Sequence, residues 1–173
     1  IFCPVEGGEA DIDMMTTIMQ DWGILSRRND VDHSTLVNSA PNDVEAVTNI
    51  ITNLISNHNS ILVFAESVEH ARNICAILNM NPNPIRAEYL YSETPNETRK
   101  RIISEFREGQ VNVLLNYGIL TTGFDAPNTD AVVIARKGLD PQSSLFIQMV
   151  GRGLRGSAFG GTENCTVVHY RGV

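Results

Sequence analysis

Long apolar runs, paired cysteines and excess positive charge are all missing from this 173-residue sequence. No stretch of eighteen apolar residues is present, so the sequence offers no candidate transmembrane helix. The first ten residues, IFCPVEGGEA, have neither the basic start nor the apolar stretch of a secretory signal peptide. We therefore expect a soluble, cytoplasmic protein with no membrane partner, and its length suits a single globular core.

The three cysteines, Cys3, Cys75 and Cys165, lie far apart and show no CxxC spacing. This pattern does not suggest a disulfide framework and favours buried thiols, since a free cysteine behaves as a small hydrophobic residue. The histidines also lack partners at ligand spacing, and we predict no metal site.

Negative charge is concentrated in the first third of the chain. Residues 1–60 hold nine acidic and two basic residues, whereas residues 61–173 hold eleven of each, for a net charge of −7. A protein that binds a phosphate backbone by bulk electrostatics is basic. Any contact with a polyanion must therefore come from a few placed groups.

Apolar runs alternate with helical patterns along most of the chain, which predicts βαβ units in a three-layer α/β domain with a mostly parallel sheet. The expected strands are residues 61–64, 85–90, 111–116, 130–135 and 164–170. The expected helices are residues 43–57, 68–79, 95–109 and a helix opened by Pro141. Asn42 and Ser67 are candidate N-caps, and Thr94 with Pro95 and Glu97 predicts a capping-box start.

The first forty residues show no sustained period beyond a short amphipathic stretch at DIDMMTTIMQDWG. We interpret residues 1–40 as a linker or an extended lead-in and residues 41–173 as the domain proper.

Ligands of parallel α/β sheets bind at the carboxyl ends of the strands, which directs attention to the loop YGILTTGFDAPNTD, residues 117–130. It holds two hydroxyls, Thr121 and Thr122, a glycine that permits close approach, Gly123, and a carboxylate, Asp125. Taken alone, this segment could also be a tight surface turn.

The segments TTGFDAP and QMVGRGLRG, at this spacing, resemble motifs V and VI of superfamily 2 helicases and translocases, and ILVFAESVEHA resembles their motif IV. The resemblance extends from about residue 43 to the end. It is strongest to the repair-type and type I and III restriction-subunit branch of the DEAD/DEAH-like helicases.

The resemblance implies that the chain is the second of two RecA-like domains, whose partner is the N-terminal RecA-like domain of the same polypeptide. ATP would lie between the two, with the Walker A loop and the acids that hold Mg²⁺ on the first domain. The sequence agrees with this, because it contains no GxxxxGK[ST] and only two lysines, Lys100 and Lys137. We expect no ATP hydrolysis by this chain alone.

Residues of motifs V and VI give the predicted catalytic and nucleotide-binding groups. By the resemblance, Arg152 and Arg155 match its two arginines and would act as arginine fingers, while Gln148 would couple the nucleotide to the cleft. Asp125 would accept a hydrogen bond from the ribose or orient an arginine, with Gly123 beside it. On a helix, Arg152 and Arg155 would share one face. The alternative is a solvated basic surface.

Predicted nucleic-acid contacts use hydroxyls and backbone amides, which position a strand without reading its sequence. The candidates are Thr121, Thr122 and Gly123, together with Ser67 and Thr94. For Ser67 and Thr94, helix capping is an equal alternative.

The chain departs from the family pattern at Tyr117, where many relatives have threonine, and at His169, where the last strand often ends in aspartate. The resemblance as a whole implies the motor half of an ATP-dependent DNA helicase or translocase. A non-catalytic module of the same fold and an RNA-directed helicase half are the alternatives.

Overall fold

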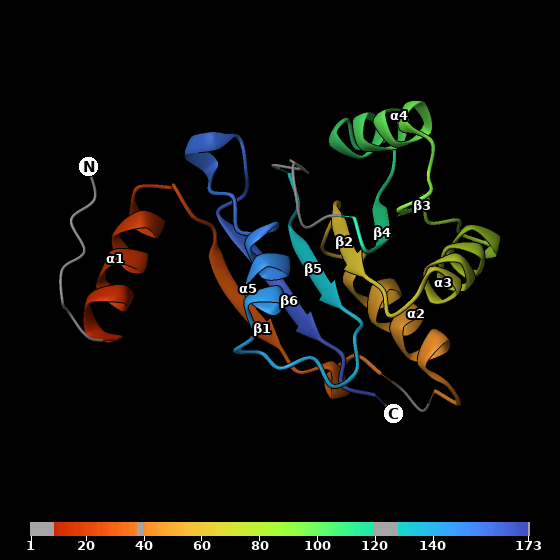
Figure 1. Cartoon of the computed structure of the whole chain (residues 1–173), viewed down its shortest axis with the longest axis horizontal. Helices are drawn as coiled ribbons and strands as arrows, with labels where there is room; N and C mark the ends of the chain where they lie inside the picture. The colour runs from red at the N-terminus through yellow and green to blue at the C-terminus, as the bar shows by residue number, and fades with distance from the viewer. Residues whose placement is uncertain (1–8, 38–39, 120–127, 173) are drawn as a thin grey trace.

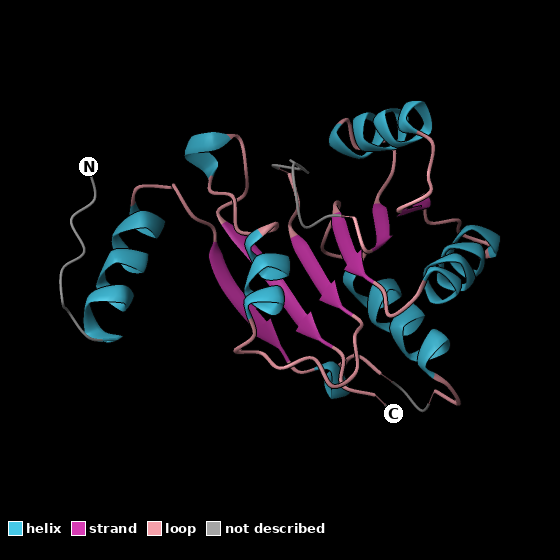
Figure 2. Cartoon of the chain, in the orientation of Figure 1, coloured by secondary structure: helices cyan, strands magenta, loops and turns pink. Residues whose placement is uncertain are grey.

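Six parallel strands form a single sheet in the computed structural model, which describes residues 9–37, 40–119 and 128–172, with side chains from residue 14 (Figures 1 and 2). The strand order is β1-β6-β5-β2-β4-β3. The strands are β1 Arg27–Val31, β2 Ile61–Phe64, β3 Ala87–Tyr91, β4 Val113–Tyr117, β5 Ala131–Ile134 and β6 Asn164–His169.

The helices are α1 Glu9–Asp21, α2 Asp43–Leu54, α3 Val68–Met80, α4 Asn96–Arg107 and α5 Ser144–Gly151, with short 3₁₀ helices η1 His33–Thr35 and η2 Ser157–Phe159. Alternate residues of the central strands pack on opposite faces of the sheet. Ile61 and Val63 join the core formed with α2 and α3, whereas Leu62 and Phe64 join the core formed with α4 and α5. The predicted three-layer α/β fold is confirmed.

The central strands are fully buried on both faces, as the unbroken apolar runs predict for a covered parallel sheet. The five predicted strands and four predicted helices are all present, with ends that differ by a few residues. Asn42 and Ser67 act as N-caps, because their side chains accept hydrogen bonds from the backbone N–H of Glu45 and His70.

Two predicted helix starts are wrong. The capping box at Thr94 does not form, since α4 begins at Asn96 and its N-cap, Pro95, has no side chain that can accept a hydrogen bond. The Thr94 hydroxyl instead accepts a hydrogen bond from the backbone N–H of Tyr91 at 3.0 Å. The last helix begins at Ser144 and not at Pro141, and the Ser143 hydroxyl caps it.

Strand β1 was not predicted. Its residues, RRNDV, are mostly exposed because β1 is an edge strand that pairs with β6 alone, so no apolar pattern marks it in the sequence. Part of the expected lead-in thus completes the sheet, while the domain division near residue 41 stays a prediction. Within the described ranges, no helix combines the length and apolarity needed to cross a bilayer.

Candidate functional site

The two arginines of QMVGRGLRG lie at different places relative to helix α5, one at its C-terminal end and one beyond it. Helix α5 buries Phe146, Met149 and Val150 against the sheet and ends at Gly151, with Arg152 as its C-cap. Gln148 is exposed and lies one helical turn before Arg152, so these two side chains share a side of the helix. Arg155 lies beyond the helix end, and the expectation that Arg152 and Arg155 share a helix face is wrong.

The glycines of this segment allow close packing. A Cβ atom at Gly153 would collide with the side chains of Val132 and Cys165, where the end of α5 meets β5 and β6. A Cβ atom at Gly156 would collide with the carbonyl oxygen of Gly23 in the lead-in. Gly151, in contrast, faces open space. The spacing of the last two glycines therefore reflects the tight path of the backbone.

The lead-in fixes the backbone of Arg155. The Ser26 hydroxyl, fully buried, lies 2.8 Å from the carbonyl oxygen of Arg155 and 2.6 Å from that of Thr162, and can donate to either. Leu25 forms an antiparallel bridge with Arg155, and the Thr162 N–H donates to the Arg155 carbonyl oxygen at 3.0 Å. These contacts lie at the amino ends of β1 and β6, opposite to the end where sequence reasoning sought the site.

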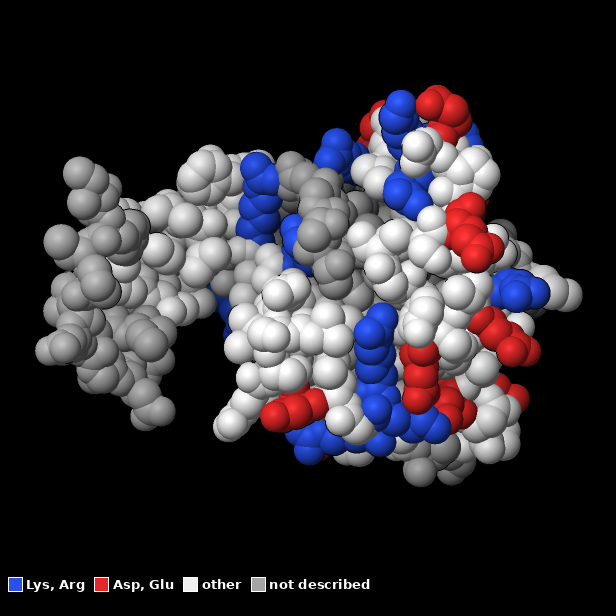
Figure 3. Space-filling model, in the orientation of Figure 1, with Lys and Arg blue, Asp and Glu red and all other residues white. Residues whose placement is uncertain are grey.

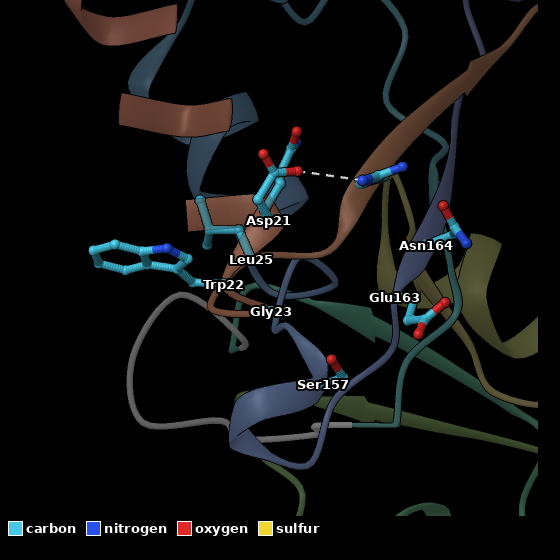
Figure 4. A pocket seen from close by; sticks show the side chains of 9 residues that line it. Asp21, Trp22, Gly23, Leu25, Ser157, Glu163 and Asn164 are labelled. Atoms are coloured by element: carbon cyan, nitrogen blue, oxygen red, sulfur yellow. Dashed lines mark hydrogen bonds and ion pairs between the residues drawn. The ribbon is translucent and has the colours of Figure 1, made fainter. Parts of the chain in front are cut away.

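A hollow of about 550 Å³ adjoins this segment, lined by residues that include Asp21, Trp22, Ser157 and Glu163 (Figure 4). Its one arginine, Arg27, is paired with Asp21 at 3.3 Å. Carboxylates repel the phosphates of a nucleotide. The lining therefore does not suit a triphosphate, and we place no nucleotide in this hollow.

At the carboxyl end, two of the four hydroxyls predicted to touch nucleic acid, those of Ser67 and Thr94, already have backbone partners. Ser67 accepts a hydrogen bond from the His70 N–H at 3.0 Å as the N-cap of α3. Thr94 is 7% exposed and accepts from Tyr91. Helix capping thus accounts for the position of Ser67, and a turn contact accounts for that of Thr94.

Sequence reasoning missed a network of charged and hydrogen-bonded side chains at this end. Asp43 on α2 accepts hydrogen bonds from Lys137 and from the Tyr170 hydroxyl, each at 2.5 Å. The bond from Lys137, then that from Tyr170, lowers the pKa of Asp43. His70 lies nearby at 9% exposure, and burial lowers its pKa. The network ties α2 to the residues that follow β5 and β6.

Arg136, directly after β5, was also missed. Its guanidinium carbon lies 5.2 Å from the centre of the Tyr117 ring, and its Nε donates to the Ala65 carbonyl oxygen at 3.1 Å. A basic residue directly after a buried strand was the available signal. Figure 3 shows basic and acidic side chains interleaved over the half of the molecule that carries α3 and α4.

A family model described as the helicase conserved C-terminal domain matches residues 43–157. The chain belongs to this family. IRC3 of Saccharomyces cerevisiae, whose name describes an ATP-dependent helicase, is 34% identical over 113 residues, which cover 65% of this chain and 16% of IRC3. UvrABC system protein B of Kosmotoga olearia is 27% identical over 158 residues, which cover 90% of this chain and 23% of that protein. The helicase domain thus spans a small part of these relatives.

Solved structures share the fold. The helicase domain of Pyrococcus furiosus Hef is 25% identical with a TM-score of 0.53, over 76% of this chain and 26% of that one. The helicase Lhr of Mycobacterium smegmatis, bound to ssDNA and AMP-PNP, is 21% identical with a TM-score of 0.61, over 85% of this chain and 19% of that one. The predicted RecA-like fold and superfamily 2 membership are confirmed.

Four predicted site residues of this helicase domain, Thr121, Thr122, Gly123 and Asp125, lie outside the described residues, so their roles stay predictions. In the described part, no three His, Cys, Asp or Glu side chains are grouped to hold a metal ion.

The sites of Cys75, Cys165 and His169 fit packing roles in the helicase domain. Burial raises the pKa of Cys75 to about 11 and that of Cys165 to about 12, as expected of buried thiols. His169 packs edge-on against Phe146 at 5.0 Å, and burial lowers its pKa. Cys3 lies outside the described residues.

Proposed function

We propose that this chain is the C-terminal motor domain of an ATP-dependent DNA helicase or translocase. The observation that carries the proposal is the family match across residues 43–157, which spans α5 and both motif VI arginines. The chain would complete an ATP site whose phosphate-binding loop lies on the N-terminal RecA-like domain of the same polypeptide. The missing GxxxxGK[ST] motif supports this division.

Arg152 and Arg155 are suited to stabilise phosphoryl transfer. Negative charge spreads over the equatorial oxygens of the transferred group, and an arginine from another domain accelerates the reaction by about 10³ to 10⁵. Both arginines are half-buried, and Arg155 has its backbone fixed by Ser26. A fixed backbone limits the entropy lost when the guanidinium binds phosphate. Mg²⁺ would be held by the first motor domain, while Gln148 would link the nucleotide to α5.

DNA is the track that we propose, since the sequence resembles the repair-type and restriction-subunit branch. An RNA track is the alternative, and competition between matched DNA and RNA strands distinguishes the two. A cytoplasmic location also stays a prediction.

The test replaces Arg155 in the polypeptide that joins this chain to its first motor domain. We expect Arg155→Ala to lower nucleic-acid-stimulated ATP turnover by about 10³, with the unfolding midpoint almost unchanged. Arg101→Ala is the matched control, because Arg101 lies on the exposed face of α4, paired with Glu105. Normal turnover in Arg155→Ala would remove the finger assignment.

A non-catalytic module with the same fold is the second candidate. The departures at Tyr117 and His169 favour it, because both replace residues typical of the family's motor domains. It predicts that the preceding segment of the polypeptide lacks a Walker A loop. The sequence of about two hundred residues upstream therefore separates the two candidates.

A further inference from the structure

Three of the four tyrosines of the chain lie at the carboxyl end of two neighbouring strands. Tyr89 and Tyr91 stack on β3, with ring centres 6.1 Å apart and planes inclined by 14°. Tyr91 is the register partner of Tyr117 on β4. Because register partners in a parallel sheet point to the same face, the side chains of Tyr91 and Tyr117 start from adjacent positions on one face.

Arg136 extends this group across the sheet. It follows β5, and the strand order β5-β2-β4-β3 separates it from Tyr117 by the end of β2. Its hydrogen bond to the Ala65 carbonyl oxygen holds the guanidinium over that strand end, 5.2 Å from the Tyr117 ring centre. Strand spacing of about 4.8 Å gives the group a span of roughly 14 Å from β5 to β3.

The exposed ring of Tyr117 indicates a binding surface at the end of β4. The residue is 38% exposed although Arg136 lies over its ring. An aromatic ring beside an arginine is the type of surface on which nucleic-acid bases stack. Stacking of bases needs little net positive charge on the protein, which suits a chain of net charge −7. Even beside Arg136 a negative charge is present, because Glu66 lies close enough to act on it electrostatically.

We propose that Tyr91, Tyr117 and Arg136 form a stacking platform for the bases of a single nucleic-acid strand. The ring of Tyr117 receives a base, Arg136 holds that ring and places a positive charge beside it, and Tyr91 extends the platform toward the sheet edge. This inference rests on the proposed nucleic-acid motor. The platform would add contact with the bases to the phosphate contacts that we predict for hydroxyls and backbone amides.

The test compares two strands that differ only in their bases. Fluorescence anisotropy measures the Kd of this chain for a labelled thymidine oligonucleotide and for an abasic strand of equal length. We expect tighter binding to the thymidine strand. We expect Tyr117→Leu to raise that Kd about ten-fold with no change for the abasic strand, and Tyr117→Phe to bind as the wild type does.

Phe159→Leu is the matched control, since Phe159 is also exposed but lies on η2, in the loop that precedes the amino end of β6. Equal affinity for both strands, unchanged by Tyr117→Leu, would overturn the platform and leave the motor proposal standing. Binding to neither strand would overturn both. If Tyr117→Leu fails to fold, Tyr91→Leu carries the same comparison, because Tyr91 lies on the edge strand.

Discussion

The two ends of the sheet are held together in different ways. At the amino end, the arginine-bearing segment is fixed by its backbone, through Ser26, the Leu25 bridge and the close approach of Gly156 to Gly23. At the carboxyl end, side chains hold one another, as Asp43 does with Lys137 and Tyr170. A backbone-fixed segment can change its side chains with little effect on the fold, whereas a side-chain network cannot. The difference explains why Arg155→Ala is expected to spare stability.

The largest expected loss of stability comes from a variant that breaks the backbone contacts at the amino end. In Gly156→Ala the new Cβ atom collides with the Gly23 carbonyl oxygen, so the lead-in must move away from the segment that follows α5. We expect a loss of about 3 kcal/mol in the free energy of unfolding, at the upper end of overpacking costs. Urea denaturation followed by circular dichroism measures it.

Gly151→Ala provides the matched control in the same motif. Nothing lies within 4 Å of a Cβ atom at Gly151, and its backbone is helical. Alanine is favoured over glycine in a helix by up to about 1 kcal/mol, so this variant is expected to be neutral or slightly more stable. Equal losses for the two variants would contradict the account of the amino end.

A smaller change in stability is expected at Ser67, at the carboxyl end. Two variants there distinguish a capping role from a nucleic-acid contact. Ser67→Ala removes the cap of α3 and is expected to cost about 1 kcal/mol. Ser67→Asp keeps a capping oxygen and adds a negative charge beside any phosphate. Urea denaturation and oligonucleotide anisotropy together decide the role.

If Ser67 only caps the helix, Ser67→Asp retains both stability and nucleic-acid affinity. If its hydroxyl also contacts a phosphate, stability stays while the Kd rises. Ser104→Ala is the control, since that exposed hydroxyl on α4 donates to the Glu108 side chain.

The same contrast explains what the sequence could predict. The buried strands and the caps at Asn42 and Ser67 are local features, written in apolar runs and in single side chains that contact their own helix. Strand β1 and the Ser26 contacts are not local, because they join residues more than 125 positions apart. Their sequences are polar or unremarkable, and only the fold brings them to β6 and to Arg155.

The candidate site residues also divide into those marked by a local motif and those brought together only by the fold. Gln148, Arg152 and Arg155 were predicted as site residues because they stand together in one motif. Arg136 and Tyr117 are nineteen residues apart and become neighbours only in the fold, where β5 and β4 lie on either side of β2. The misplaced helix face came from extending the helical pattern past Gly151, where α5 ends.

The smallest expected effect is a pH dependence at the carboxyl end, due to His70. Burial lowers the pKa of this imidazole from 6.5, and the charges of Glu66 and Asp43 oppose that shift without cancelling it. The unfolded chain therefore binds a proton at a higher pH than the folded chain does. Stability from His70 is fully present above about pH 6.5 and is lost as pH falls below that value. Asp43, whose pKa is lowered from 3.8, contributes stability that is lost only in more acidic solution.

His70→Gln removes the titration at this site. We expect its urea midpoint to fall less steeply than that of the wild type between pH 6.5 and pH 5. His169, whose pKa burial also lowers, is present in both proteins, so the difference between the two curves belongs to His70. Identical slopes would mean that His70 has the same pKa folded and unfolded. The network of side chains at the carboxyl end would then lose no stability when His70 is protonated.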